Sequence, residues 1–111
     1  MPPEESPAAT LPPEFVKRPV RIHLAAGMAV EVDATLDLRG HSVPDALGRL
    51  RDRIEDGAFL GWRTLHVILG EGPGLHEALL AFLQESPAGR IGRYAQAPIP
   101  MGGAQAWVLY Y

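Results

Sequence analysis

The stretch LDLRGHSVPDALGRLRDRIEDGAFLGWRTLHVILGEGPG, residues 36–74, decides the fold. It opens with a short strand at 36–38, and Ser42 is then a suitable N-cap for a helix. The apolar residues that follow have helical spacing: Val43, Ala46, Leu47, Leu50, Ile54 and Ala58. Gly61 is a typical residue to end that helix. Residues 65–69 form a nearly continuous apolar run, which is typical of a buried parallel strand.

The rest of the chain continues this alternation. A second helix is indicated by an apolar face made of Leu75, Ala78, Leu79, Phe82 and Leu83. Ser86–Gly89 would end this helix, and residues 91–97 and 106–111 have the pattern of two further strands. The element order from Leu36 is β-α-β-α-β-β, and strands that alternate with helices favour right-handed parallel crossovers. We therefore expect a two-layer α/β sandwich over residues 36–111, with a four-stranded mixed sheet and two helices.

The N-terminal third has a different character. Residues 1–14 hold five prolines and three glutamates, a composition typical of a disordered leader. Residues 15–35 contain two alternating stretches, 20–24 and 28–32, with Ala26-Gly27 as a candidate turn between them. We expect an extended arm or a small hairpin here.

Composition excludes several classes of protein. The chain has 111 residues and no cysteine, which excludes a disulfide scaffold, a thiolate zinc site, an iron–sulfur cluster and a cysteine nucleophile. No apolar run is long enough to span a membrane, and the first ten residues lack the features of a signal peptide, so a cytoplasmic location is expected. The net charge is −3, so a nucleic-acid site would have to be a local patch.

Chemistry is expected where parallel strands end, because open α/β sheets bind ligands beyond the carboxyl ends of their strands. The first strand leads into Arg39-Gly40-His41, with Asp37 close to that edge. The second leads into the loop Gly70-Glu71-Gly72-Pro73-Gly74, with His76 in the first turn of the next helix, where N–H groups and the helix dipole favour an anion. These two loops could form a small phosphodiester site.

Each of these residues also has a structural interpretation. The glycine loop 70–74 could be only a tight turn, because it is neither a Walker A loop nor a dinucleotide fingerprint. Arg39 could be a surface arginine that caps strand carbonyls, and Asp37 could bond to loop N–H groups. His41 could be an ordinary loop residue.

Other polar and aromatic residues give weaker signals. His66 lies inside an apolar strand and is expected to be a packed histidine. The chain has four histidines without metal-ligand spacing, so the sequence gives no zinc signal. Tyr110 and Tyr111 point to opposite faces of a strand, so one of them could be exposed and stack on a base.

Taken together, the LDLRG motif at 36–40, the glycine-rich loop and the late GGA at 102–104 resemble the Smr (small MutS-related) domain. The likeness covers about residues 36–111 and is greatest to the C-terminal Smr domain of the second type of bacterial MutS homologue. It implies a fold like the C-terminal domain of translation initiation factor three. It also implies binding of DNA or RNA, cleavage or nicking by several members, and roles in recombination, repair or rescue of collided ribosomes. Other domains of a longer MutS-type chain would then be possible partners.

The resemblance assigns roles residue by residue. The chain departs from the family in the second motif, which is also one residue shorter before His76, and in the late glycine pattern at 102–107. Asp37, Arg39 and Gly40 match the Leu-Asp-Leu-His/Arg-Gly motif, and the loop glycines match those of His-Gly-Lys-Gly-x-Gly. The histidine and lysine of that second motif are Leu69 and Glu71 here.

Three functions stay open on this basis. In an endonuclease, Asp37 would be the base or a metal ligand, and Arg39 the phosphate clamp. His41 or His76 would substitute for the lost histidine, and Mg²⁺ or Mn²⁺ would be the candidate metals. Amides of Gly70, Gly72 and Gly74 would stabilise the developing charge. The alternatives are a catalytically silent nucleic-acid-binding module and a protein-interaction module.

Overall fold

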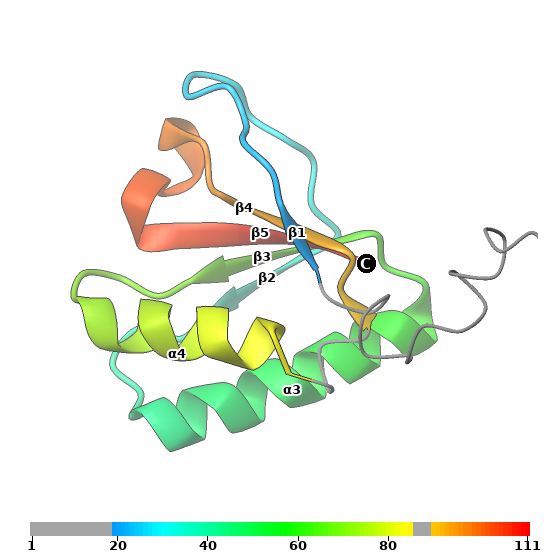
Figure 1. Ribbon diagram of the computed structural model, residues 1–111. Coiled ribbons are helices and arrows are strands. Elements are labelled where there is room, and N and C mark those ends of the chain that lie inside the picture. Colours follow the sequence, from blue (N-terminus) through cyan, green and yellow to red (C-terminus); the bar gives the residue numbers. More distant parts are fainter. Residues whose placement is uncertain (1–18, 86–89) are drawn as a thin grey trace, which may run out of the picture.

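The computed structural model describes residues 19–85 and 90–111, and Figure 1 shows the arrangement of their elements. The elements in chain order are β1 (Val20–Arg21), β2 (Ala34–Asp37), α3 (Val43–Leu60), β3 (Thr64–Ile68), α4 (Pro73–Leu83), β4 (Arg93–Gln96), two short 3₁₀ turns (Ile99–Met101 and Gly103–Gln105) and β5 (Ala106–Tyr110). The expected order β-α-β-α-β-β from residue 36 onward is confirmed. The expected stop at Ser86–Gly89 lies outside the described residues.

The sheet has five strands in the order β1-β4-β5-β3-β2. β2 and β3 are parallel with Asp37 opposite Ile68, and β5 is antiparallel to both of its neighbours, β3 and β4. The α/β class and the mixed sheet are therefore confirmed, but the expected count of four strands is wrong. Val20–Arg21 adds a fifth strand, because the free edge of β4 offers backbone groups that Val20 N and Ile22 N use, at 2.9 and 2.8 Å.

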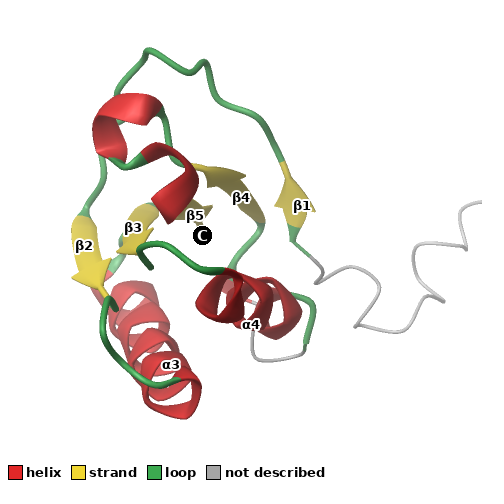
Figure 2. Ribbon diagram, turned by 90° about the vertical axis from the view of Figure 1, so that its left-hand side faces the viewer, coloured by secondary structure: helices red, strands yellow, loops and turns green. Residues whose placement is uncertain are grey.

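Both helices cover one face of the sheet, as Figure 2 shows. The main core lies between these layers and is built by alternate residues of the strands and the inward faces of the helices. Its fully buried members include Leu38, Leu50, Ile54, Leu65, Val67, Leu79, Leu83, Ile91 and Leu109. Side chains of the intervening strand residues, Asp37 among them, therefore point to the opposite face.

The described part of the arm is extended and does not form a hairpin. A turn is present at Ala26-Gly27, with Met28 N donating to Ala25 O at 3.2 Å, but residues 28–32 pair with no strand. The arm instead crosses from β1 at one edge to β2 at the other, over the face that the helices leave open (Figures 1 and 2). Its alternating apolar residues Leu24, Val30 and Val32 pack there in a second, smaller cluster around Val108.

Helix α3 begins and ends where the sequence indicates. Ser42 Oγ accepts a hydrogen bond from Asp45 N at 3.3 Å, and Gly61 ends the helix with φ +81°, a conformation that favours glycine. None of the helices within residues 19–85 and 90–111 is long and apolar enough to cross a bilayer.

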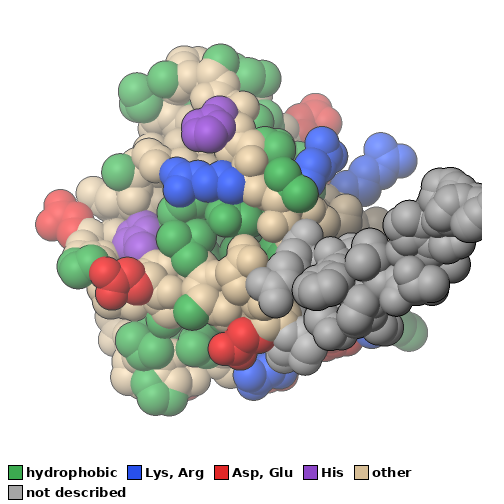
Figure 3. Space-filling view, viewed as in Figure 1, with side chains coloured by type: hydrophobic (Ala, Val, Ile, Leu, Met, Phe, Trp, Pro, Cys, Tyr) green, Lys and Arg blue, Asp and Glu red, His purple; other side chains and the backbone are tan. Residues whose placement is uncertain are grey.

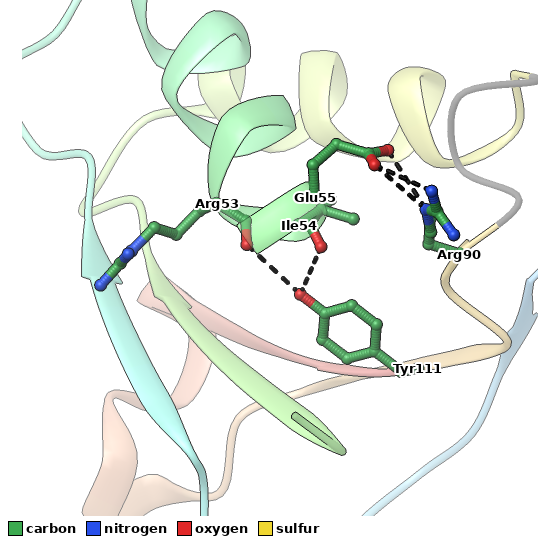
Figure 4. Close-up of polar contacts among 5 residues, drawn as sticks. All are labelled: Arg53, Ile54, Glu55, Arg90 and Tyr111. Atoms are coloured by element: carbon green, nitrogen blue, oxygen red, sulfur yellow. Dashed lines mark hydrogen bonds and ion pairs between the residues drawn. The ribbon is translucent and has the colours of Figure 1, made fainter. Parts of the chain in front are cut away.

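Tyr111 fastens the sheet to α3, as Figure 4 shows. Its hydroxyl donates to Ile54 O at 2.9 Å, and burial raises the pKa of that hydroxyl to about 12. A side chain at Gly57 would collide with the Tyr111 hydroxyl, so this helical glycine makes room for the contact. The nearby Glu55–Arg90 ion pair, 3.0 Å long, is exposed and contributes little by comparison.

Candidate nucleic-acid interface

The first loop presents a paired aspartate and arginine at the end of β2. Asp37 Oδ1 accepts from Arg39 N at 3.0 Å and from Arg39 Nε at 2.9 Å, while Oδ2 accepts from Arg39 Nη2 at 2.7 Å. Both side chains are about half exposed, at 46% for Asp37 and 60% for Arg39. These hydrogen bonds, together with the positive charge, lower the pKa of Asp37 to about 2, and the same pairing raises the pKa of Arg39.

The second loop lies beside the first, as the parallel pairing of β2 and β3 requires. A Cβ built at Gly70 would lie 3.1 Å from Arg39 Cγ, so the arginine stem passes closely over this glycine. Gly70 also has φ +82°, and the amides of Leu69 and Gly70 both donate to the carbonyl of Gln105, at 2.9 and 3.1 Å. Backbone bonds from the third loop, 98–105, therefore fix the start of the glycine loop.

The glycine loop runs into α4 with Gly72 as the N-cap, and no side chain caps this helix start. Gly74 lies in the first turn, with nothing within 4 Å of where a Cβ would lie. Open space and uncapped N–H groups at a helix start fit an anion. Glu71 is exposed at the same point, 3.5 Å from Gln105 Nε2, and its charge opposes an anion.

Both ring nitrogens of His76 have partners inside the protein. Nε2 lies 2.9 Å from Gly70 O, and Nδ1 accepts from Trp107 Nε1 at 2.8 Å. Because the indole only donates, the imidazole is held as the neutral tautomer with its proton on Nε2. His76 thus supports the glycine loop, and a phosphate contact would first have to break one of these bonds. Its expected role in phosphate binding stays a prediction.

His41 lies near the first loop but is engaged elsewhere. Its Nδ1 is 2.7 Å from Asp45 Oδ2, and that carboxylate also accepts from Arg49 Nε at 3.1 Å. These contacts, Arg49 foremost, lower the pKa of Asp45. No hydrogen bond joins His41 to Asp37 among the described residues, so the catalytic role assigned to His41 stays a prediction. Gly40 is exposed in the loop between them with φ +85°.

The structure also shows where the other residues singled out from the sequence lie. His66 is 8% exposed and lies 2.7 Å from Met101 O and 3.3 Å from Thr35 Oγ1, so it is the packed histidine that was expected. Tyr110 and Tyr111 are both half-buried, and Arg93 lies over the Tyr110 ring. Within the described residues, no three histidine or acidic side chains cluster as a metal site.

Two contributors to the site were missed from the sequence. Gln105 holds the glycine loop through its carbonyl, and Trp107 holds His76 through its indole N–H. A backbone carbonyl gives no residue-type signal, so Gln105 could not have been found that way. Trp107 lies in the late strand, where its apolar neighbours favoured a core interpretation.

The fold and the two loops define an α/β domain with an Asp-x-Arg-Gly strand end beside a glycine loop. Residues 36–110 match the Smr domain family, so the chain belongs to that family. It is similar to the Endonuclease MutS2 of Geobacillus kaustophilus (strain HTA426), at 33% identity over 72 residues, and of Geobacillus thermodenitrificans (strain NG80-2), at 35% over 72 residues.

Each of these alignments covers 64% of this chain and 9% of the relative. The chain thus matches less than a tenth of the length of those proteins. A solved structure is also similar, the Smr domain of Thermus thermophilus MutS2, with a TM-score of 0.64 and 31% identity. That similarity covers 69% of this chain and 95% of the solved chain, so it spans nearly the whole of that domain.

Proposed function

We propose that the domain binds the sugar–phosphate backbone of nucleic acid at the carboxyl ends of β2 and β3, with Arg39 as the principal contact. The observation that supports this proposal is the bidentate ion pair between Asp37 and Arg39, which is exposed at the carboxyl end of β2. A guanidinium has five N–H donors in a planar fork. Asp37 takes the donor on Nε and one of the two on Nη2, and the described residues take none from Nη1, so that side of the fork is available to a phosphate.

Asp37 acts in this proposal as a positioning residue. Its pKa of about 2 keeps the carboxylate charged at physiological pH, so its ionic attraction to Arg39 is present there. The same low pKa makes the carboxylate a weak general base at neutral pH. Its proximity to a phosphate-holding arginine suits orientation better than proton abstraction.

The surrounding charges set the strength expected of this interface. The chain carries a net charge of −3, and Glu71 places one acid at the glycine loop. Binding that depends on few phosphate contacts is weak and only moderately sensitive to salt. We therefore expect affinity for nucleic acid in the micromolar range or weaker, about 10⁻⁶ to 10⁻⁴ M at physiological salt.

Phosphodiester cleavage is the second candidate function. Two relatives bear the name endonuclease, and the Asp37-Arg39-Gly40 motif is retained with Asp37 half exposed. In that case Asp37 could also help to hold Mg²⁺ or Mn²⁺, and Arg39 would stabilise charge on the phosphate. The changes at Leu69 and Glu71 support binding without cleavage as the first candidate.

One gel tests both candidates. The parent protein, Asp37→Ala and the exposed α3 control Asp52→Ala are incubated with supercoiled plasmid and structured RNA, with and without Mg²⁺ or Mn²⁺. A retarded, uncut substrate for the parent and the control, weakened in Asp37→Ala, supports binding alone. Nicking that only Asp37→Ala loses supports the nuclease. No retardation and no product from folded protein would contradict both and favour a protein partner.

A further inference from the structure

A hollow lies at the same end of the sheet as the two loops, but at the opposite edge. β1, β4, β3 and β2 all run in one direction, so the ends of β1 and β4 share this end with those of β2 and β3. The hollow has a volume of about 460 Å³. Its lining includes Arg21, His23, Leu24, Gln96, Ile99 and Ala104.

Arg21 is the charged group of this hollow, and its guanidinium is supported by the ring of Trp107. Its guanidinium carbon lies 5.1 Å from the centre of the Trp107 ring. Trp107 is only 5% exposed, and its indole N–H is fixed by His76, which in turn bonds Gly70 O. An ordered chain of contacts therefore joins the glycine loop to Arg21. Among the ion pairs of the described residues, none holds Arg21, which is exposed.

The walls of the hollow combine apolar and polar groups. Ile99 is 71% exposed, an unusual position for a large aliphatic side chain, and Leu24 is a second aliphatic residue of the lining. Gln96 and His23 supply an amide and an imidazole that can donate and accept hydrogen bonds. Figure 3 shows basic and histidine side chains gathered with hydrophobic ones on the face where β1 lies in Figure 1.

These groups fit one class of ligand, a nucleotide with an unpaired base. A base can stack on an exposed guanidinium, and that of Arg21 lies over the Trp107 ring, 5.1 Å from its centre. The polar edge of the base would meet Gln96 and His23, and Ile99 would pack against its ring. A paired base inside a duplex cannot present its ring faces in this way.

We infer that the hollow at the ends of β1 and β4 is a nucleotide subsite that makes the domain prefer single-stranded nucleic acid. The inference rests on the proposed function, since the same strand would contact Arg39. Four interstrand spacings separate β2 from β1, roughly 19 Å. A single strand of a few nucleotides crosses that distance along the ends of the strands.

The test uses the fluorescence of Trp107, which Trp62→Phe leaves as the only tryptophan of the chain. This protein is titrated with oligothymidylate and with a hairpin duplex of equal length. Arg21→Gln is compared with Arg51→Gln, since Arg51 also lies over an aromatic ring, that of Phe82, but on the helices. Arg21→Lys keeps the charge without the planar stacking surface, and thermal unfolding verifies that each variant is folded.

The inference expects quenching of Trp107 by oligothymidylate and tighter binding of the single strand than of the duplex. Arg21→Gln lowers single-strand affinity about tenfold and removes the quenching. Arg21→Lys has an affinity between those of the parent protein and Arg21→Gln, and Arg51→Gln has the affinity of the parent protein. Equal affinity for both substrates, or no loss in Arg21→Gln, overturns the inference. If Arg39→Gln still weakens binding in that case, the proposed function stands. No binding by the parent protein would overturn both.

Discussion

The two loops at the carboxyl ends of β2 and β3 retain different features of the family's two sequence motifs. In the first loop the side chains are retained, and Asp37 and Arg39 bind each other within 2.7–3.2 Å. In the second loop the glycines are retained, but Leu69 is buried in the core and Glu71 carries the opposite charge to the family's lysine. The bonds from the Leu69 and Gly70 amides to Gln105 O hold the second loop through its backbone and not through the side chains at 69 and 71.

The difference implies that substitutions in the two loops act on different properties. Changes to the second-loop glycines should act mainly on stability, because the loop is held by its backbone. Changes to charged side chains in either loop should act mainly on binding, because these side chains are exposed and contribute little to stability.

Gly70→Ala is expected to have the largest effect, a loss of about 2 kcal/mol in the free energy of unfolding. Its φ of +82° disfavours any side chain, and the new Cβ would press on Arg39 Cγ at 3.1 Å. Gly74→Ala is the matched control, because Gly74 is helical with open space around it. That variant should be neutral or more stable by up to about 0.5 kcal/mol. Equal urea midpoints for the two variants would mean that the loop is not held as described.

Glu71→Lys is expected to raise affinity for nucleic acid about fivefold and to steepen its salt dependence by about 0.7 in logarithmic slope. The substitution replaces a repulsive charge at the start of α4 with an attractive one. Glu85→Lys makes the same change in net charge beyond the other end of α4 and serves as the control. If both lysine variants gain equally, the effect reports net charge only, and the glycine loop does not contact the nucleic acid.

The smallest expected effect is the acid titration of the first loop. The pKa of Asp37 is about 2 against an ordinary value of 3.8, so the pair stabilises the folded protein above pH 4, and this is lost as pH falls toward 2. Because both side chains are exposed, the change in stability should be slight. Carboxyl NMR signals should show a midpoint near 2 for Asp37, rising toward 3.8 in Arg39→Gln. A midpoint near 4 in the parent protein would argue against the pairing.

Most of the fold and part of the candidate site could be predicted from local patterns in the sequence. Ser42 and Gly61 mark the ends of α3 because caps act on the nearest few residues, and the apolar spacing gave both helices. The alternation of strands and helices predicted that β2 and β3 are parallel. Parallel pairing brings the loops after these strands together, so Arg39 lies against Gly70. These are short-range rules combined with one topological rule.

Long-range pairing could not be read in the same way. The two alternating stretches of the arm suggested a possible hairpin, but the free edge of β4 takes one and the open sheet face takes the other. Likewise, nothing in the spacing indicated that Trp107 would occupy a ring nitrogen of His76. Such contacts depend on the packed fold, not on neighbours in sequence.

The most direct test of the central claim is the salt dependence of binding to a short single strand for the parent protein and Arg39→Gln. Arg49→Gln is the control, since Arg49 is equally exposed but pairs with Asp45 on α3. The account expects Arg39→Gln to lose about tenfold in affinity at low salt and about 0.7 in logarithmic slope, with Arg49→Gln unchanged. Equal slopes for the parent and Arg39→Gln, or an equal loss in Arg49→Gln, would contradict it.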